Sequence, residues 1–175
     1  MFGQTWRIYH QILNKYPLRT QMVQTGLIMG LGDLVSQRVI HEKSDIDPIS
    51  VIRFSGIGTF FVGPSVRLWY LFMERVIGSA VNKKTTFIKV GMDQLLFAPT
   101  FTAGIMIVIN PLQAKSFDEI KKELRSKYTD VMLNGWKIWP MAQVVNFYFI
   151  PFLYRPLFVN IVALFWNTYL AWKIN

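Results

Sequence analysis

The chain alternates between long apolar stretches and short polar ones, a pattern typical of helices that cross a bilayer. From Gln94 to Ala114 there is no charged residue over 21 positions, and two further uncharged runs of 17 residues cover 138–154 and 156–172. A helix needs about 20 apolar residues to cross the hydrocarbon of a membrane. The pattern therefore predicts an all-α fold, a polytopic transmembrane helix bundle of four to five kinked spans.

The boundaries of the spans follow from the polar interruptions. We predict spans near residues 18–40, 49–73, 86–110 and 131–150, and leave open whether the fifth apolar segment, 156–172, also crosses. The joint at 152–155 is short, so the last two segments are either two spans or one kinked span followed by a re-entrant or interfacial piece. The hydrophilic stretch 115–130 is expected on the surface. Residues 1–175 then form a single integral membrane domain.

Residues 1–17 form a basic and acid-poor amphipathic start. Phe2, Trp6, Tyr9, Leu13 and Tyr16 recur at helical spacing on one face. Such a segment is typical of a helix that lies in the membrane interface. It also resembles a mitochondrial targeting element, and this second hypothesis is tested by deleting residues 1–16 and locating the protein.

Composition and charge support the membrane interpretation. Hydrophobic residues make up 52% of the chain and charged residues 17%, against about 25% charged in a soluble domain. The net charge is +9, but the basic residues stand mostly at the ends of apolar segments, where they anchor helices to lipid headgroups. We therefore expect the lipid bilayer as a partner and no direct nucleic acid binding.

Several kinds of chemistry are excluded or unsupported by the residue types present. The chain has no cysteine, which excludes disulfides and thiol catalysis, and its two histidines have no partner at a metal-ligand spacing. A phosphate-cradling loop and a nucleophile elbow are also missing from the sequence. We expect no cofactor, no metal and no enzymatic activity.

Each apolar stretch carries a residue that disturbs a helix, beside polar side chains. A proline removes one backbone hydrogen bond and clashes with the carbonyl four residues back. Hydrocarbon cannot satisfy freed carbonyls or bare charges, so these groups must face one another or water. We therefore expect the polar groups to gather around a common hydrated space. The predicted hinges are Gly32, Pro64, Pro99 and Pro140.

Ten polar residues are the candidates for lining or gating such a space. Their chemistry mixes two carboxylates with an excess of cations, which favours anionic or weakly selected solutes. The structural alternative is that Lys89 and Asp93, four apart on one helix face, simply pair, and that Arg67 and Arg155 reach to headgroups. The candidates are Asp33, Gln37, Arg67, Lys89, Asp93, Gln94, Lys137, Gln143, Asn146 and Arg155.

Small and aromatic residues suggest contacts between helices and with the interface. Gly26 and Gly30 form one small-residue face, and Ser55, Thr59 and Gly63 form another. Faces of this kind let membrane helices approach closely. The aromatic pair at positions 69 and 70, near the end of the second span, is interpreted as an interface anchor.

Several spaced motifs occur in one order along the chain. They are Met29-Gly30-Leu31-Gly32-Asp33 with Ser36-Gln37; Phe61-Val62-Gly63-Pro64 with Trp69-Tyr70; Asp93-Gln94 with Phe97-Ala98-Pro99; and Trp139-Pro140, Gln143, Asn146-Phe147, Pro151, Tyr154-Arg155, Trp166-Asn167 and Tyr169-Leu170. These motifs resemble the Mpv17 and peroxisomal membrane protein family over nearly the whole chain, and their details are closer to its mitochondrial branch than to its peroxisomal branch.

The resemblance implies a channel-like protein of the mitochondrial inner membrane, gated and weakly selective. It also implies a link to mitochondrial DNA maintenance, to deoxynucleotide supply and to membrane-potential and oxidative homeostasis. A peroxisomal membrane location is the alternative. Two features depart from the family: Arg67 stands where relatives tend to have a small residue or histidine, and the chain has no cysteine for thiol-based gating.

Two hypotheses about function remain open from the sequence. The first is a gated pore or carrier for small ions or metabolites that are not identified. A single copy with four or five helices leaves little room for a wide lumen, so this protein is expected to form a homo-oligomer or to join an inner-membrane complex. The second is a non-conducting scaffold or regulator of inner-membrane complexes, and an accessory role in lipid or peroxide metabolism is weaker.

Overall fold

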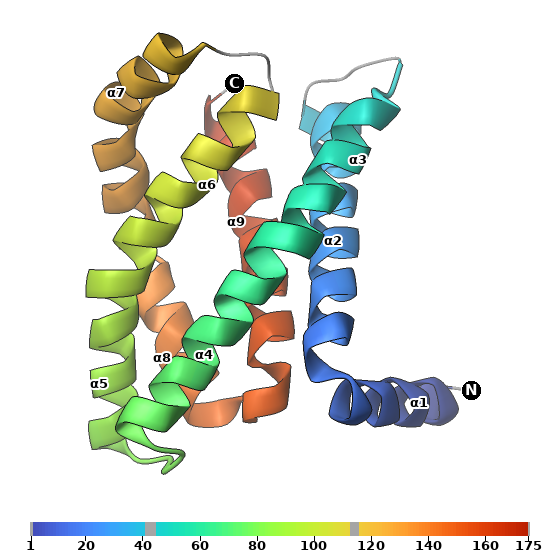
Figure 1. Ribbon diagram of the computed structural model, residues 1–175, viewed down its shortest axis with the longest axis vertical. Helices are drawn as coiled ribbons and strands as arrows, with labels where there is room; N and C mark the ends of the chain where they lie inside the picture. Colours follow the sequence, from blue (N-terminus) through green and yellow to red (C-terminus); the bar gives the residue numbers. More distant parts are fainter. Residues whose placement is uncertain (1, 41–44, 113–115, 175) are drawn as a thin grey trace. The chain divides into compact units, whose positions relative to one another are not determined.

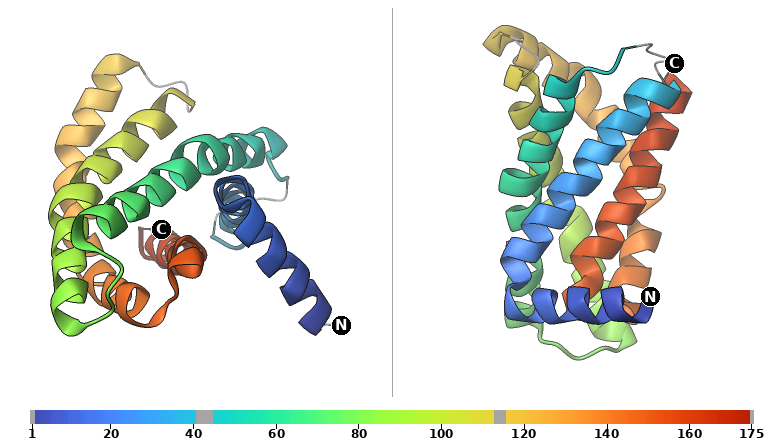
Figure 2. Two further views of the ribbon diagram at one scale, coloured as in Figure 1. Left: turned by 60° about the horizontal axis from the view of Figure 1, so that its bottom comes forward. Right: turned by 90° about the vertical axis from the view of Figure 1, so that its right-hand side faces the viewer.

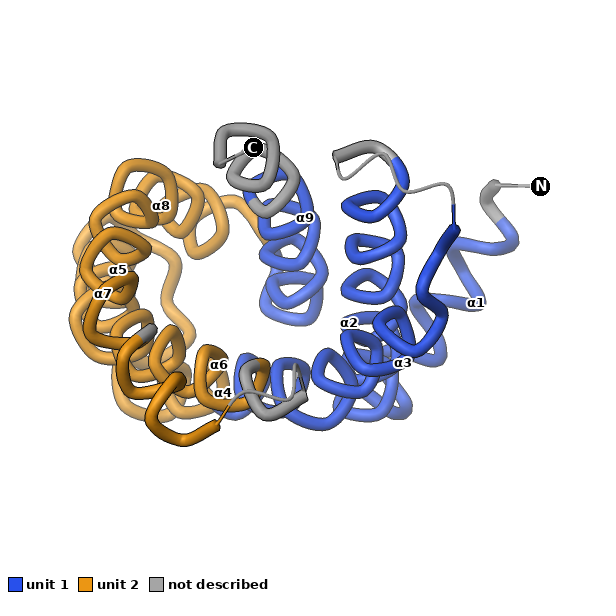
Figure 3. Tube along the Cα trace, turned by 90° about the horizontal axis from the view of Figure 1, so that it is seen from above, with its two compact units in different colours: residues 1–68, 151–175 blue, residues 69–150 orange. Residues whose placement is uncertain are grey.

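The computed structural model describes residues 2–40, 45–112 and 116–174, and within these ranges it contains helices and no strand (Figure 1). The prediction of an all-α fold is confirmed. The chain divides into two compact units, residues 1–68 with 151–175 and residues 69–150, which are coloured separately in Figure 3.

Unit 1 begins with α1 (Phe2–Lys15), which ends where α2 (Pro17–Val35) turns sharply away from it (Figure 1). Pro17 suits the first turn of a helix, because its missing N–H would have no partner there. Leu13 of α1 is fully buried, whereas Trp6, Ile8 and Ile12 are about half exposed. A helix at 2–15 is therefore present, and its placement in a membrane interface stays a prediction.

The second helix pair of unit 1 forms through close backbone approach. α3 (Pro48–Ile57) starts at Asp47, whose side chain caps the N–H groups of Ile49 and Ser50. Beside α2, a Cβ added at Gly58 would lie 2.8 Å from the Cα of Gly26, and one added at Gly26 would lie 2.8 Å from the Ser55 carbonyl oxygen. The two predicted small-residue faces thus pack against each other within one copy of the chain, and Gly58 belongs to the same contact.

The chain continues through η2 (Gly58–Val62) into α4 (Gly63–Ile77), which passes from unit 1 into unit 2. Unit 1 is completed by η4 (Phe152–Tyr154) and α9 (Arg155–Ile174). α9 lies along α2 (Figure 2), and Asn160 of α9 donates a 2.7 Å hydrogen bond to Thr25 of α2. Buried amides and hydroxyls need such partners in an apolar surrounding.

Unit 2 consists of the end of α4 and five further segments. These are α5 (Lys83–Met92), η3 (Asp93–Phe97), α6 (Ala98–Leu112), α7 (Phe117–Gly135) and α8 (Trp139–Phe149). α7 opens with a reciprocal cap between Ser116 and Glu119 and lies beside α6. The hydroxyl of Tyr128 on α7 donates to the Pro99 carbonyl at 3.1 Å.

Pro64 and Pro99 do not interrupt their helices. Each follows a five-residue π-helical turn and one small residue, so that Gly63 N–H bonds to the Gly58 carbonyl and Ala98 N–H bonds to the Asp93 carbonyl. A π turn uses hydrogen bonds five residues back, which widens the helix before the proline ring. The wider turn keeps both helices continuous across these two prolines. Whether they act as hinges stays a prediction.

The segment around Pro140 differs from its prediction. α7 ends at Gly135, three residues form a turn, and α8 starts at Trp139 with Pro140 in its first turn. Pro140 therefore stands at the start of a helix and not within one. At about 1.5 Å per residue, the 11 residues of α8 extend roughly half the thickness of the hydrocarbon. The expected span 131–150 is thus two separate helical pieces.

Two helices in the described part of the chain are long and apolar enough to cross a membrane, Pro48–Ile77 and Lys83–Ile109. They correspond to the second and third predicted spans and carry large exposed apolar side chains, such as Phe60 and Leu95. A bundle of four to five spans stays a prediction for the remaining segments.

A third π turn, η1 (Ser36–Ile40), ends α2. Gly32 lies in the regular part of α2, where it is partly buried, before this turn. A fourth predicted hinge therefore sits next to a change of helical winding, although it is not itself the site of that change.

Candidate functional site

Asp93 lies at the centre of a buried polar network in unit 2. It is 2% exposed and occupies the first position of η3, which brings its carboxylate toward α4 and α8. Its Oδ1 accepts from Trp69 Nε1 at 2.9 Å, and its Oδ2 accepts from the side-chain amides of Gln94 at 2.9 Å and Gln143 at 3.0 Å. Three neutral donors therefore hold this carboxylate.

The network continues from Gln143 along α8 to α4. Asn146 donates to Gln143 Oε1 at 2.9 Å and to the Tyr70 hydroxyl at 3.0 Å, and it is fully buried. Phe147 packs edge-on against the Tyr70 ring, with centroids 5.7 Å apart. The network joins side chains from α4, η3 and α8, and its donors point toward acceptors within the network.

Aromatic residues also contribute to the network, although the sequence pattern did not indicate this role for Trp69 and Tyr70. Trp69 is partly buried and stacks on Phe97 at 5.0 Å, while Tyr70 is only 2% exposed. The Tyr70 ring is buried and packs against Phe147, and the role of this pair as an interface anchor stays a prediction. A buried Trp or Tyr needs a partner for its polar atom. The polar residues Asp93 and Asn146, which lie in apolar segments, were the sequence signals for such partners.

Lys89 pairs with Glu74 and not with Asp93. Its Nζ lies 2.5 Å from Glu74 Oε1, with Lys89 2% exposed and Glu74 17% exposed. The alternative of a Lys89–Asp93 pair is therefore wrong, because the carboxylate of Asp93 is already held by neutral donors. The second predicted span ended at residue 73, but α4 extends to Ile77 and places Glu74 within reach of Lys89 on α5. The ion pair gives unit 2 a second charged site.

The polar candidates of unit 1 form two sets. Asp33 accepts hydrogen bonds from Gln37 at 2.7 Å and Ser50 at 3.1 Å, and Gln37 also bonds to both backbone groups of Asp47. This set joins the end of α2 to the start of α3. Asp33 is partly buried and Gln37 is 4% exposed.

Arg67 and Arg155 form the second set of unit 1. Their guanidinium carbons lie 4.8 Å and 5.7 Å from the centroid of one ring, Phe152. Both arginines are less than a tenth exposed, so their guanidinium groups are buried against this ring, and contact with a lipid headgroup stays a prediction. Each cation lies against the ring and gains cation–π stabilisation.

The ten candidates therefore form several local clusters. Asp93, Gln94, Gln143 and Asn146 meet in unit 2, Lys89 has its own partner, and Lys137 is exposed and donates to Asn134 at 2.8 Å. Within unit 1 the Asp33 set and the Arg67 set lie toward opposite ends of α2, because Gln21, beside η4, is twelve positions or roughly 18 Å from Asp33. The Asp33 set and the Arg67 set therefore do not share one space within unit 1.

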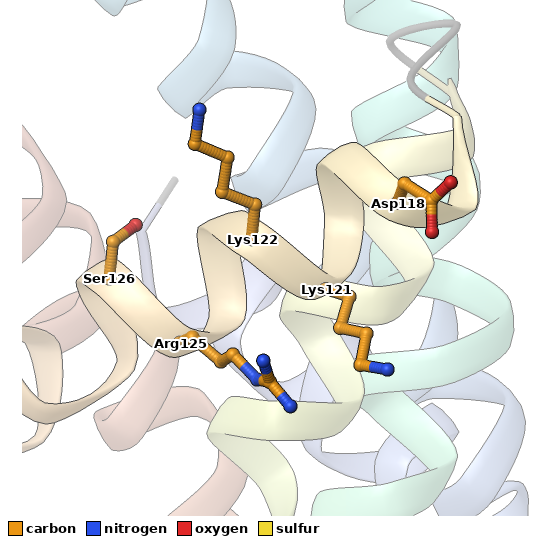
Figure 4. Close-up of a pocket in the computed structure, with 5 residues that line it drawn as sticks. All are labelled: Asp118, Lys121, Lys122, Arg125 and Ser126. Carbon is orange, nitrogen blue, oxygen red and sulfur yellow. The ribbon is translucent and has the colours of Figure 1, made fainter.

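One further surface with polar residues lies on α7. Figure 4 shows a hollow on α7 whose lining side chains point in different directions, Asp118, Lys121, Lys122, Arg125 and Ser126. All come from one helix and do not converge, which suits contact with anionic headgroups better than a specific ligand. Within the described ranges, His, Asp and Glu side chains do not gather in groups of three that could hold a metal ion.

The start of the chain forms an aromatic cluster in unit 1. Tyr154 stacks on Trp6 with centroids 5.4 Å apart, and its hydroxyl contacts His10. Tyr9 donates to Gln24 Oε1 at 2.7 Å. Burial, and to a smaller extent Tyr154, raises the pKa of Tyr9 above the ordinary value of 10.0.

Comparison with known proteins gives one family. The family model described as the Mpv17 / PMP22 family matches residues 110–171. The chain is 36% identical over 173 residues to the mitochondrial inner membrane protein Mpv17 of Xenopus laevis and 34% identical over 172 residues to that of Danio rerio, with 97% of each chain covered. Protein sym-1 of Neurospora crassa is 34% identical over 167 residues, covering 94% of this chain and 95% of its own. No solved structure matches the chain.

Proposed function

This chain belongs to the Mpv17 / PMP22 family and is a protein of the mitochondrial inner membrane, and from that premise we propose that it is a gated, weakly selective channel-like protein. The proposal rests on the position of Asp93, a carboxylate within the Lys83–Ile109 helix that is long and apolar enough to span the membrane. An ionisable group in such a helix is expensive to bury and is a functional candidate by default.

The three donors around Asp93 provide a physical basis for the proposed gate. Side-chain amides of Gln94 and Gln143 rotate readily, so they can hold the carboxylate in a closed state and release it to water in an open one. A released carboxylate would offset part of the positive potential of the cationic candidates, which suits a weakly selective path. Closed and open states would differ by the loss of a few hydrogen bonds, each worth about 1.5–3 kcal/mol when one partner is charged.

The π turn at η3 supports the same location for a gate. π turns inside α-helices are rare and are found frequently at functional sites, because a local change of winding turns side chains to a different face. η3 carries both Asp93 and Gln94 and is followed by Pro99 in α6. A return of this turn to regular α-helix would rotate the carboxylate relative to its partners on α4 and α8.

Conductance of the purified protein in planar bilayers tests the proposal. The wild-type protein should conduct, and Asp93→Asn should shift the reversal potential measured in a salt gradient, since it removes the fixed charge without changing shape. Asp118→Asn is the matched control, because it removes one negative charge on the exposed face of α7 and should leave the reversal potential unchanged. A silent wild-type protein, or an unchanged reversal potential in a folded Asp93→Asn protein, would remove the proposal.

We further propose that copies of the chain associate, and that conduction supports deoxynucleotide supply, mitochondrial DNA maintenance and membrane-potential and oxidative homeostasis. The effect on DNA would be indirect, through solutes, with no direct binding of nucleic acid. The proposal assigns no catalytic step to the chain. Mass measurement of the protein in detergent tests association, and a monomer that conducts would show that one copy provides the whole path.

A non-conducting scaffold is the second candidate, and one observation favours it. Both carboxylate oxygens of Asp93 already have donors, so the network can serve as a rigid connection between α4, α5 and α8. Against this candidate, the predicted small-residue faces pack on each other between α2 and the α3–η2 segment, so they are not left for contact with a partner protein. Bilayers that stay silent with folded protein, while inner-membrane complexes are lost from cells lacking it, would favour this candidate.

A further inference from the structure

Arg67 on α4 carries a buried hydrogen-bond donor without an acceptor in the described part of the chain. Its Nη1 atom is inaccessible and has no acceptor among the described residues. Its guanidinium carbon lies 4.8 Å from the centroid of the Phe152 ring, which offers a π face and no lone pair. Leaving a buried charged donor without an acceptor costs more free energy than leaving a neutral one unpaired. A site of this kind is complete only when an acceptor binds.

The surroundings of Arg67 add positive potential. Arg155 lies against the same ring with its guanidinium carbon 5.7 Å from the centroid, and it is 3% exposed. It also starts α9, where the helix dipole is positive, and the first turn of α9 contains no acidic residue. Two buried cations and a helix start around one partly buried ring favour an anion strongly over a neutral ligand.

A third polar group near this ring has an unmet requirement. Gln21 of α2 is fully buried and donates to the carbonyl of Leu153, the residue after Phe152, at 3.2 Å. Its Oε1 has no donor among the described residues. A ligand that combines anionic oxygens with a hydroxyl group could satisfy both the guanidinium and this amide.

We propose that Arg67, with Arg155 beside it, binds the phosphate group of an anionic ligand at Phe152 in unit 1. A planar guanidinium with several donors matches the oxygens of a phosphate, and a fork of this kind is preferred over a lysine wherever bidentate recognition matters. This inference does not depend on conduction, since the site is built within unit 1 and uses none of the Asp93 network.

The phosphate can come from a phospholipid headgroup or from a free phosphate compound. Aromatic and basic residues surround this end of unit 1, including Trp6 stacked on Tyr154 and Arg19 against Tyr16. Such residues are typical of the membrane interface. The chemistry is the same for both sources, and the test below separates them.

The test compares the thermal unfolding of three proteins in a zwitterionic detergent. The probes are a short-chain phosphatidylglycerol, a short-chain phosphatidylcholine and inorganic phosphate. Arg67→Gln removes the charge, and Arg75→Gln is the matched control because Arg75 is exposed on the same helix. We expect wild type and Arg75→Gln to be stabilised by at least one anionic probe, and half-saturation for Arg67→Gln to need roughly 10- to 100-fold more of it.

The outcome identifies the source or overturns the site. Stabilisation by phosphatidylglycerol alone assigns a lipid headgroup, and stabilisation by inorganic phosphate assigns a free phosphate compound. No stabilisation of wild type by either anion, or an equal response of Arg67→Gln, would overturn the proposal. If Arg67→Gln cannot be purified, Arg67→Lys keeps the charge but loses the fork, and an unchanged half-saturating concentration in that protein would also overturn it.

Discussion

The ion pair between Lys89 and Glu74 gives a quantitative prediction for unit 2. Its atoms are 2.5 Å apart, and the ammonium is 2% exposed while the carboxylate is 17% exposed. Removing one partner of a buried pair costs about 3–5 kcal/mol, because the remaining charge has no compensation. Glu74→Gln leaves the deeply buried ammonium, so we expect a loss in this range. Lys89→Met leaves the more accessible carboxylate, so we expect a smaller loss of about 2–3 kcal/mol.

A double-mutant cycle separates the pair from the two single effects. In the double variant Lys89→Met with Glu74→Gln no charge is left behind, and the loss should be smaller than for Glu74→Gln alone, with a coupling free energy of about 2–3 kcal/mol. The assay is reversible unfolding in mixed micelles of increasing sodium dodecyl sulfate fraction, followed by far-ultraviolet circular dichroism.

The exposed Lys137 provides the control for this cycle. Lys137→Met removes an ammonium that bonds to the Asn134 side chain at the surface, and it should change the free energy of unfolding by about 0.5 kcal/mol or less. A loss below about 1 kcal/mol for Glu74→Gln, or strictly additive single effects, would refute the view that this pair is buried and mutually compensating.

Three further predictions concern the helix contact, the carboxylate and the start of the chain. Gly58→Ala should lower the free energy of unfolding by about 1–2 kcal/mol because a Cβ would lie 2.8 Å from the α2 backbone, whereas Gly56→Ala, with open space around it, should raise it by about 0.5–1 kcal/mol; equal effects in the micelle assay would contradict the packing. Trp69→Phe keeps a ring but removes a donor to Asp93, and should lower the free energy of unfolding by about 1.5–3 kcal/mol, so a loss under about 0.5 kcal/mol would speak against that hydrogen bond. The raised pKa of Tyr9 means that the neutral phenol stabilises the fold fully below pH 10.0 and that this contribution is lost as the pH rises through the raised pKa. The absorbance difference between wild type and Tyr9→Phe should therefore titrate above pH 10.0, and a midpoint at pH 10.0 would contradict the burial of this phenol.

The apolar pattern predicted much of the helical framework. The helices at Pro48–Ile77 and Lys83–Ile109 correspond to the predicted second and third spans, extended at their ends. Both contain an internal proline that suggested a break, yet both are continuous. The expected disturbance by proline concerns the hydrogen bond to the carbonyl four residues back, whereas a π turn uses the carbonyl five residues back. The local sequence did not indicate the π turns.

Partners of the buried groups were harder to predict than their burial. The sequence indicated that Asp93 and Arg67 lie inside apolar helices, and both are less than a tenth exposed. Their contacts are with Gln143 and Phe152, which are distant in sequence, and spacing rules for one helix cannot find such pairs. The pairing of Lys89 with Glu74 was missed for a similar reason, because the length of α4 decides whether Glu74 reaches α5.

Water access to the Asp93 network tests the channel account most directly. The chain has no cysteine, so single thiols can be introduced without background. Gln143→Cys places a thiol beside the carboxylate, and Phe149→Cys places one on an exposed apolar position of the same helix. In bilayers under conducting conditions, the account predicts that a charged, water-soluble thiol reagent labels Gln143→Cys and leaves Phe149→Cys unreacted. Full protection of Gln143→Cys while current flows would contradict it.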